Sequence, residues 1–161
     1  MKQFLARLFG RAAPTLYEAK PRDAAAIAAL HGQSFRRGWG QGEIGGLLAE
    51  RAVLCHCARI GHRFAGFILS RIAADEAEIL SVAVVAKRRG SGVGRALLDL
   101  HLRRLAGLGA RAVFLEVDEQ NVAARRLYAR AGFQEVGRRE GYYRDAAGKA
   151  ATALVLRRDL S

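Results

Sequence analysis

The stretch Val82–Leu102, VAVVAKRRGSGVGRALLDLHL, sets the architecture of the surrounding chain. Its first residues, Val82–Val85, are apolar and mostly β-branched, which favours a strand. The segment Lys87–Gly94 is basic and contains several glycines, which indicates a turn. From Arg95 onward, leucines recur at the spacing of one helix face: Leu98, Leu102 and Leu105. The stretch therefore predicts a strand, a glycine-rich turn and a helix in succession.

This predicted turn has the properties of an anion site. The first backbone N–H groups of a helix have no partner inside it and carry a partial positive charge. The glycines of the turn let a phosphate approach the main chain closely. Basic side chains add long-range attraction: Lys87, Arg88, Arg89 and Arg95. We therefore expect the turn to bind a phosphate or a pyrophosphate.

The glycine spacing narrows the kind of phosphate ligand. A Walker loop requires GxxxxGK[ST], and no Gly-Lys-Ser/Thr follows here, which argues against a P-loop nucleotidase. The dinucleotide fingerprint GxGxxG begins at Gly90 and Gly92, but Arg95 replaces its third glycine, which argues against a nicotinamide site. The pattern that remains is Arg89-x-x-Gly92-x-Gly94. The alternative interpretation is an ordinary glycine turn before a helix.

Length and composition are those of one domain. The chain has 161 residues, of which 51% are hydrophobic. No apolar run reaches the ~18 residues that a membrane-spanning helix needs, so we expect no membrane contact. Because Arg7 interrupts the apolar part of the N-terminus, we interpret residues 1–14 as an arm or short amphipathic helix, with a signal peptide as the alternative. Residues 15–161 are then a single domain.

The charge of the chain points to anionic partners. Lys and Arg number 27 against 15 Asp and Glu, a net charge of +12. A basic protein attracts a phosphorylated cofactor, nucleic acid or the surroundings of the ribosome. The sequence has neither an arginine-rich tail nor an aromatic ribonucleoprotein motif, so direct nucleic-acid binding is the weaker interpretation.

The two cysteines predict a reduced compartment rather than a metal centre. Cys55 and Cys57 would share one face of a strand, and His56 the other. The remaining histidines are scattered along the sequence, so we expect no metal site. Two cysteines this close, without a secretory signal, favour a cytoplasmic protein.

The rest of the chain predicts alternating strands and helices. Strand–helix–strand crossovers require a partly parallel sheet covered by helices, an α/β or α+β fold. The apolar run Ala112–Val117 also predicts a strand that is buried on both faces. The predicted strands are Thr15–Ala19, Ala52–Ala58, Arg63–Arg71, Glu78–Val85, Ala112–Val117, Phe133–Arg139 and Thr152–Leu156; the predicted helices run from Asp23 to near Phe35, around Ile44 to Glu50, from Arg95 to Gly107 or Gly109, and from Asn121 to Ala131.

A second group of polar residues follows in LEVDEQNVAARRLYARAGFQEVGRREGYY, residues 115–143. Glu116 interrupts an apolar strand, and an ionised carboxylate there is costly unless it faces a polar site. With the Arg89/Gly92/Gly94 turn, the pattern Leu-Glu-Val, Asn, Leu-Tyr-x-x-x-Gly-Phe and Arg-x-x-Tyr-Tyr resembles the GNAT N-acetyltransferase superfamily. Within it, the chain is similar to the RimI-type branch, the ribosomal-protein-alanine N-acetyltransferases. The resemblance runs from about Glu78 to Leu156, and more loosely back to Pro21.

This resemblance implies a fold, a cofactor and a set of roles. The sheet would be mixed and largely antiparallel, with a central V-shaped splay between two parallel strands that holds acetyl-CoA. Glu116 would be the general base and Tyr128 the general acid of acetyl transfer to a protein N-terminus, possibly of a ribosomal protein. The cofactor-binding residues would be Val82, Ala83 and Val84 with Asn121 for the pantetheine arm, and Arg89, Gly90, Ser91, Gly92, Val93, Gly94 and Arg95 for the pyrophosphate.

Alternatives remain for individual residues. Glu116 could instead form an ion pair with an arginine, and Glu78 on the neighbouring strand is the competing base. Tyr128 could be a packing tyrosine. The substrate-binding candidates, which could equally be packing residues, are Trp39, Tyr142 and Tyr143.

Two other functions stay open. The chain has Ala150-Ala151 where the branch usually carries an acidic pair, and Gly38-Trp39 where it usually carries Pro-Trp. The first departure puts the acceptor peptide in doubt, so the enzyme could acetylate a small amine such as a polyamine or aminoglycoside. The net charge of +12 is also compatible with a non-catalytic module that binds RNA or the ribosome.

Overall fold

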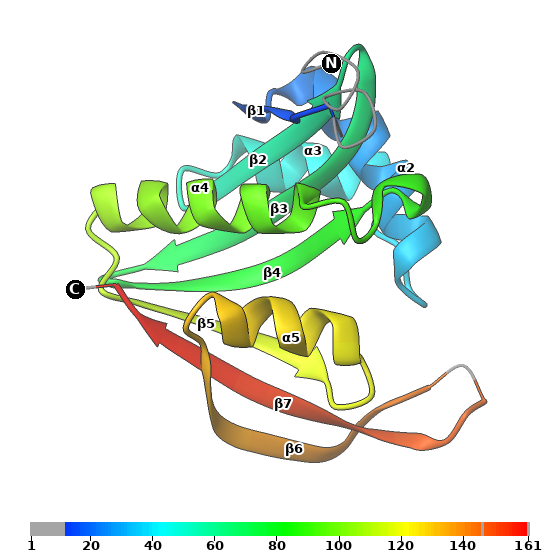
Figure 1. Ribbon diagram of the computed structural model, residues 1–161, viewed down its shortest axis with the longest axis vertical. Helices are drawn as coiled ribbons and strands as arrows, with labels where there is room; N and C mark the ends of the chain where they lie inside the picture. The colour runs from blue at the N-terminus through cyan, green and yellow to red at the C-terminus, as the bar shows by residue number, and fades with distance from the viewer. Residues whose placement is uncertain (1–11, 146, 161) are drawn as a thin grey trace, which may run out of the picture.

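A computed structural model describes residues 12–145 and 147–160 of the chain (Figure 1). Most of the predicted arm, residues 1–14, lies outside this part. Within the described residues, no helix is long and apolar enough to cross a membrane. The elements, in chain order, are β1 (Thr15–Glu18), η1 (Pro21–Asp23), α2 (Ala24–Ser34), α3 (Gln41–Ala49), β2 (Val53–Ile60), β3 (Arg63–Ala73), β4 (Glu76–Val84), η2 (Ala86–Arg88), α4 (Val93–Gly107), β5 (Ala112–Asp118), α5 (Val122–Arg130), β6 (Gln134–Arg144) and β7 (Ala150–Asp159).

The strands form one sheet of seven in the order β1-β2-β3-β4-β5-β7-β6. Among the described strands, only β4 and β5 pair in parallel, and every other neighbouring pair is antiparallel. The helix α4 makes the crossover between the two parallel strands, as the strand–turn–helix pattern of the sequence requires. The prediction of a mixed, largely antiparallel sheet flanked by helices is confirmed.

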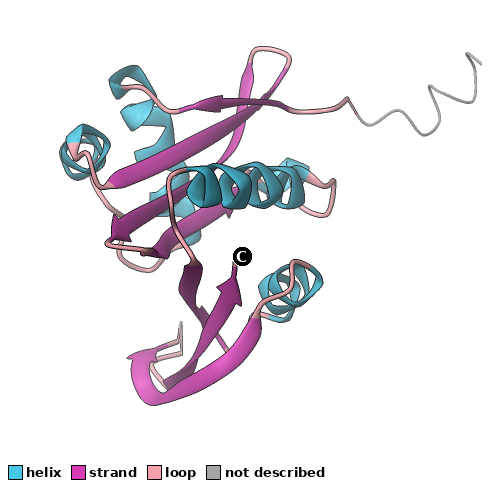
Figure 2. Ribbon diagram, turned by 90° about the vertical axis from the view of Figure 1, so that its left-hand side faces the viewer, coloured by secondary structure: helices cyan, strands magenta, loops and turns pink. Residues whose placement is uncertain are grey.

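The two parallel strands separate soon after they meet. Their pairing runs over four residues, from Glu76↔Ala112 to Ile79↔Leu115. Beyond that point β4 stays paired with β3 as far as Val84, and β5 stays paired with β7 as far as Asp118. Figure 1 shows the two strands diverging, and in Figure 2 the strands of the C-terminal half lie with α5 below the rest of the sheet. The predicted V-shaped splay is therefore present.

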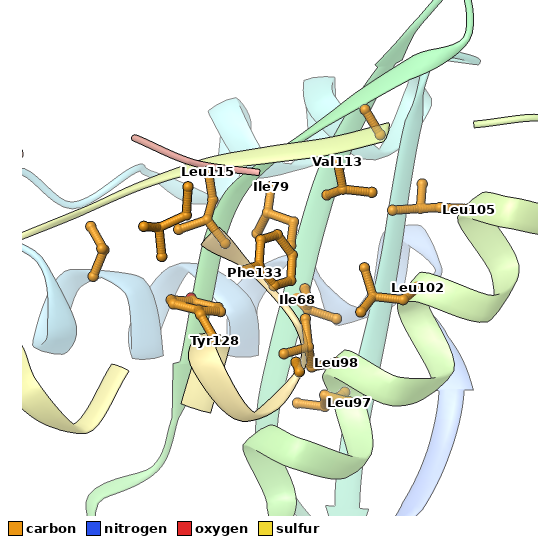
Figure 3. Close-up of a cluster of buried hydrophobic side chains, with 14 of the residues drawn as sticks. Ile68, Ile79, Leu97, Leu98, Leu102, Leu105, Val113, Leu115, Tyr128 and Phe133 are labelled. Carbon is orange, nitrogen blue, oxygen red and sulfur yellow. The ribbon is translucent and has the colours of Figure 1, made fainter. Parts of the chain in front are cut away.

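Two apolar clusters hold the helices against opposite faces of this sheet. Under α4 and α5, Leu97, Leu98 and Tyr128 pack with Ile79 and Leu115 of the parallel strands (Figure 3). Under α2 and α3, the second cluster is made of Ala24, Ile27, Leu30, Ile44, Cys55, Cys57, Phe67, Leu69 and Ala83. Because no residue of β5 belongs to this second cluster, the corresponding face of β5 is only half-covered.

This half-covered face corrects one prediction. Ala112–Val117 was expected to be buried on both faces, but Phe114 and Glu116 are half-buried while Val113, Leu115 and Val117 are buried. The apolar residues of β5 meet α4 and α5 on one side, and no helix of the second cluster reaches the other side. The strand is therefore one-sided, and Glu116 lies on its more open side.

Several predicted boundaries were also wrong. The strands β6 and β7 extend to Arg144 and Asp159, beyond the predicted ends at Arg139 and Leu156, because each supplies the other's main-chain partners along a long hairpin. The helix α4 begins at Val93, two residues before Arg95, because Val93 is buried and belongs to the core. Apolar periodicity does not reveal the added ends of β6 and β7, since charged and tyrosine residues occupy those positions.

A chain of buried polar side chains links α4 to β2 and β3. His101 of α4 is fully buried; its Nδ1 lies 2.7 Å from Nδ1 of His56, and its Nε2 lies 2.7 Å from Oγ of Ser70. A neutral His101 satisfies both bonds, because it donates from one ring nitrogen and accepts at the other. Burial, and secondarily His56, lower the pKa of His101 to about 3, and burial also lowers the pKa of His56. Around His56, Glu18 opposes this shift and Arg104 adds to it.

We expect the buried hydrogen bonds of His101 with His56 and Ser70 to make the fold sensitive to acid. A histidine pKa that lies below its unfolded value of about 6.5 means that the unfolded state binds the proton first. The contribution of His101 to the free energy of unfolding should therefore be constant above pH 6.5. Below pH 6.5 it should fall by up to about 1.4 kcal/mol for each pH unit. Urea unfolding at pH 7.5 and pH 5 measures the loss.

The His101→Gln variant is the comparison, because glutamine can hold both bonds and does not titrate. The difference between the two pH values should shrink in this variant, whatever its stability at pH 7.5. An equal acid loss in wild type and variant would contradict the assignment to His101.

Candidate active site

The glycine turn ends where α4 begins, at the open end of the splay. Gly90 and Gly92 adopt φ values of 70° and 93°, a region that residues with a side chain rarely enter. The main-chain N–H groups in the first turn of helix α4 come after the last hydrogen bond of the glycine turn. They have no carbonyl partner inside the helix. The predicted residues Arg89 to Arg95 thus form a positively polarised helix start.

Side chains within the turn are held in place by local bonds. Ser91 Oγ donates a short hydrogen bond to the main-chain oxygen of Arg88, and Arg89 Nε donates to the main-chain oxygen of Val84 at 3.2 Å. Arg95 Nε donates to both carboxylate oxygens of Asp99, one helical turn away, at 3.0 and 3.1 Å. The charge of Arg95 is therefore shared with Asp99, which leaves Lys87, Arg88 and Arg89 as the stronger sources of attraction for an anion.

The edge of β4 that faces the splay presents main-chain groups without a strand partner. Val85 donates its N–H to Ala65 of the β3 side at 2.8 Å. Because successive strand residues direct their main-chain bonds to opposite neighbours, Val82 and Val84 direct theirs toward β5, which has already separated. Ala83 directs its groups to β3 and packs beneath α2 and α3. An extended ligand arm could bind the main-chain groups of Val82 and the N–H of Val84 as a strand would, while the Val84 oxygen accepts from Arg89.

A glycine that the sequence analysis did not single out positions this edge. A Cβ added at Gly66 of β3 would lie 2.7 Å from the Ala83 oxygen and 3.3 Å from Cα of Val84. The close approach of β3 and β4 at this point thus requires glycine. The only signal in the sequence was a glycine within an apolar strand, which indicates a close backbone approach or a bulge.

Glu116 is the first residue of β5 beyond the parallel pairing. Its neighbour Leu115 forms the last pair with β4 and is buried under α4 and α5. Side chains alternate along a strand, so Glu116 lies on the opposite, more open face, and its side chain is 25% exposed. Glu78 lies on the same face but is exposed and precedes the splay, paired with Phe114. Of the two candidate bases, Glu116 is the one at the point where β4 and β5 begin to separate.

An arginine holds the Glu116 carboxylate. Arg139 Nη1 of β6 lies 3.2 Å from Glu116 Oε1, and the guanidinium of Arg139 stacks on the ring of Tyr142 at 5.1 Å from its centroid. The structure thus brings Glu116 and the predicted substrate residue Tyr142 together through Arg139, the arginine of the Arg-x-x-Tyr-Tyr pattern, and the ion pair of Glu116 with an arginine that the sequence left open is present. No local signal could identify this partner, because 23 positions separate the two charged residues and the register of β6 decides which side chain meets Glu116.

Tyr128 lies on the other side of the sheet. It belongs to α5, is buried, and packs edge-to-face on Phe133 with 5.6 Å between ring centroids. Burial raises the pKa of its phenol to about 12, so the hydroxyl keeps its proton throughout the neutral range. Both the packing role and a proton-donating role agree with this position.

Asn121 and Trp39 have structural partners of their own. Asn121 Oδ1 accepts the N–H of Ala124 at 3.1 Å and caps α5, which leaves its amide nitrogen as a donor at the end of β5. Trp39 covers the second cluster, where its ring stacks on His31 at 4.3 Å and its main-chain N–H donates to His31 Nδ1 at 2.9 Å. The side chain of Tyr143 lies outside the described residues.

Beyond Ile79 and Leu115 the two parallel strands no longer pair, and we call this separation of β4 and β5 the slot. Glu116 lies on the more open face of the sheet, Tyr128 is buried in the core on the opposite face, and the glycine turn follows the end of β4. A phosphorylated ligand with an extended, hydrogen-bonding arm fits the turn and the free edge of β4. No group of three or more His, Cys, Asp and Glu within residues 12–145 and 147–160 is placed to hold a metal ion.

The sequence of this chain matches a known protein family and several of its members. Residues 15–133 match the acetyltransferase (GNAT) family. The [ribosomal protein bS18]-alanine N-acetyltransferase of Haemophilus influenzae is 35% identical over 91 residues, which cover 56% of this chain and 62% of that protein. The chain thus aligns with less than two thirds of that relative's length.

Solved structures extend the likeness over nearly the whole chain. The crystal structure of the ribosomal-protein-S18-alanine N-acetyltransferase from Escherichia coli superposes with a TM-score of 0.85 at 25% identity, covering 92% of this chain and 95% of that one. The yncA protein of Salmonella typhimurium, with acetyl-CoA as its cofactor, gives a TM-score of 0.83 at 18% identity and covers 92% of this chain and 95% of its own. This second likeness concerns the fold alone.

The close contact at Gly66 predicts that a single methyl group disturbs the slot. In Gly66→Ala, the added Cβ would push the main chain of Ala83 and Val84 toward the splay. We expect the free energy of unfolding to fall by about 1–3 kcal/mol and acetyl-CoA to bind more weakly. Urea unfolding and calorimetric titration measure the two effects.

Gly46→Ala is the matched control. Gly46 lies in α3, and its added Cβ would meet nothing within 4 Å. Alanine should stabilise this helix by roughly 0.5–1 kcal/mol and leave acetyl-CoA affinity unchanged. If Gly66→Ala behaved like Gly46→Ala, the role given to the β3–β4 contact would be wrong.

Proposed function

The chain belongs to the acetyltransferase (GNAT) family, and we propose that it transfers the acetyl group of acetyl-CoA to the α-amine at the N-terminus of a protein. The observation that carries this proposal is the slot between β4 and β5. Glu116 lies where the two strands begin to separate, and the glycine turn lies at the wide end. The relatives named as alanine N-acetyltransferases of a ribosomal protein support an N-terminal acceptor.

We assign the proposed contacts of acetyl-CoA to three parts of the chain: the glycine turn, the edge of β4 and Asn121. The turn from Arg89 to Arg95 would receive the pyrophosphate at the start of α4, where amides and arginines favour negative charge. Val82 and Val84 would hydrogen-bond the pantetheine arm with their main-chain groups, and Asn121 would donate to it from its amide nitrogen. Bound in this way, acetyl-CoA supplies an acetyl thioester to the narrow part of the slot.

Residues on the two sides of the slot then carry out different proton transfers. A bond forms between the amine nitrogen and the acetyl carbon, and the bond from that carbon to sulfur breaks. Glu116 accepts the proton that the amine loses, directly or through water, and Tyr128 gives its proton to the departing sulfur. Tyr128 retains that proton before the reaction because burial raises its pKa to about 12.

The acceptor is chosen by the ease of deprotonating its amine. Only a neutral amine has the lone pair that attacks, and an α-amine has a pKa near 8 whereas a lysine side chain has one of about 10.4. Near neutral pH the N-terminus is therefore the better nucleophile. A ribosomal protein is the first acceptor we would test, since the relatives are named for one.

We place this activity in the cytoplasm. Cys55 and Cys57 are both free thiols in the second cluster. Thiols this close remain reduced in a cytoplasm and are oxidised more readily outside it.

The proposal is tested by CoA release with hexapeptides that carry a free or a blocked N-terminus. Release with free but not with blocked peptides supports N-terminal transfer. Release with polyamines or aminoglycosides in place of peptides would instead indicate a small-amine acetyltransferase.

Replacing the base should stop turnover without affecting the cofactor. Glu116→Gln keeps the shape of the side chain and removes its ability to accept a proton. We expect acetyl-CoA affinity as in wild type and a decrease of roughly 10²-fold or more in kcat. Glu78→Gln is the comparison: a full rate in Glu116→Gln together with a large loss in Glu78→Gln would transfer the role to Glu78.

Removing the phenol tests the acid. Tyr128→Phe keeps the packing on Phe133 and deletes the proton donor. We expect kcat to fall by about 10²-fold, because general acid catalysis contributes typically 10²–10⁴-fold. Tyr17→Phe is the matched control, since Tyr17 of β1 hydrogen-bonds Asp23 at 3.4 Å and also has its pKa raised by burial to about 12. Equal rates in the two variants would leave Tyr128 with a packing role only.

A further inference from the structure

Two arginines border the face of the sheet on which Glu116 lies. Arg139 of β6 contacts the Glu116 carboxylate at 3.2 Å. Arg36, which follows α2, donates from Nη1 to the main-chain oxygens of Arg144 and Asp145 at 3.1 and 3.0 Å. Arg139 belongs to the C-terminal half of the sheet, and Arg36 reaches that half from the N-terminal one. Each half of the molecule thus contributes one of these cations: Arg139 at the Glu116 carboxylate, and Arg36 at the hairpin of β6 and β7.

An acceptor can reach Glu116 from only one face of the sheet. The other face of β5 is closed, because Val113, Leu115 and Val117 pack under α4 and α5. On the face of Glu116, the connection between α2 and α3 (residues 35–40) meets the hairpin of β6 and β7 through the two bonds of Arg36. A peptide whose amine lies at Glu116 must therefore leave the sheet on this face, on which Arg139 contacts Glu116 and Arg36 joins the two segments.

The segments along this path carry more positive than negative charge. Residues 35–40 and 139–151 contain five cationic side chains and two carboxylates: Arg36, Arg37, Arg139, Arg144 and Lys149 against Glu140 and Asp145. Asp145 is engaged in its own turn, where Oδ1 accepts the amides of Ala147 and Lys149, each at 2.9 Å.

The sheet beneath adds little free negative charge. The Glu116 carboxylate is paired with Arg139, and Asp118 Oδ1 accepts the amide of Gln120 at 2.8 Å. Arg157 of β7 is paired with Asp159 at 2.9 Å. On β4, the exposed Glu78 and Glu76 lie before the splay. An acceptor therefore meets arginines once its chain leaves Glu116.

Building on the proposed N-terminal transfer, we infer that the acceptor carries acidic side chains directly after its N-terminal residue, and that Arg36 and Arg139 recognise them. A carboxylate at these positions gains charge-assisted bonds to a guanidinium, whereas a lysine or arginine is repelled. Exposed charge pairs of this kind change affinity about twofold to fivefold each.

Arg139 also links this recognition to the base. While it contacts Glu116, the arginine competes with the amine proton for the carboxylate oxygen. An acceptor carboxylate would draw the guanidinium away and leave Glu116 free to accept the proton. Arg139 is thus a positioning residue, whose stack on Tyr142 keeps it within reach of both carboxylates.

The test compares three hexapeptides that begin with alanine and continue with two aspartates, two serines or two lysines. We expect kcat/KM at low ionic strength to decrease in that order, with about tenfold between the acidic and the basic peptide. Arg36→Gln and Arg139→Gln should each reduce this ratio, and so should added salt, because exposed charges are screened. The ratio is taken within each variant, so a general loss of activity cancels.

Arg59→Gln is the matched control. Arg59 lies on β2 beside β1, at the far edge of the sheet, and its removal changes the net charge by the same unit. It should leave the ratio unchanged.

Equal use of the three peptides, or a preference for the basic one, would overturn the acidic acceptor while leaving N-terminal transfer intact. A ratio that survives salt and both arginine variants would overturn the role of Arg36 and Arg139. Inactivity toward all three peptides, the neutral one included, would overturn the proposed function together with the acceptor assignment.

Discussion

The short parallel ladder between β4 and β5 is the constraint on which the rest of this molecule depends. It lasts for four residue pairs, and the strands then keep their outer partners, β3 and β7, while losing each other. Main-chain groups inside a protein need partners. The separated edge of β4 is therefore a place where a ligand with its own hydrogen-bonding groups can replace a strand, and the glycine turn lies directly after this edge.

The same separation creates different environments for the two groups that we assign to proton transfer. Helices α4 and α5 cover one face, so Tyr128 is desolvated and its pKa rises to about 12. The second cluster ends at β4, so Glu116 stays partly exposed and keeps an arginine partner. One sheet, covered by helices on unequal lengths of its two faces, thus buries the phenol that we propose as the acid and leaves the side chain that we propose as the base partly exposed.

The prediction from sequence was best where chemistry and local structure coincide. The glycine and arginine spacing between Arg89 and Arg95 correctly indicated a turn before a helix, because positive φ values and helix starts are local requirements. Apolar periodicity located each strand and helix but misplaced ends such as those of β6 and β7, where charged residues extend a hairpin. The burial of β5 was overestimated, since an apolar run does not reveal which helices cover the strand.

By itself, the sequence determined the strand–turn–helix unit, the order of the elements and the placement of Cys55 and Cys57 on one strand face. These features depend on residues that lie within a few positions of one another, so local sequence patterns predict them. Only the tertiary structure decided that Arg139 pairs with Glu116, that Arg36 joins the hairpin of β6 and β7, and that His101 meets His56 and Ser70. Each of these contacts joins residues more than 20 positions apart, and strand register and helix docking, rather than local pattern, bring such residues together.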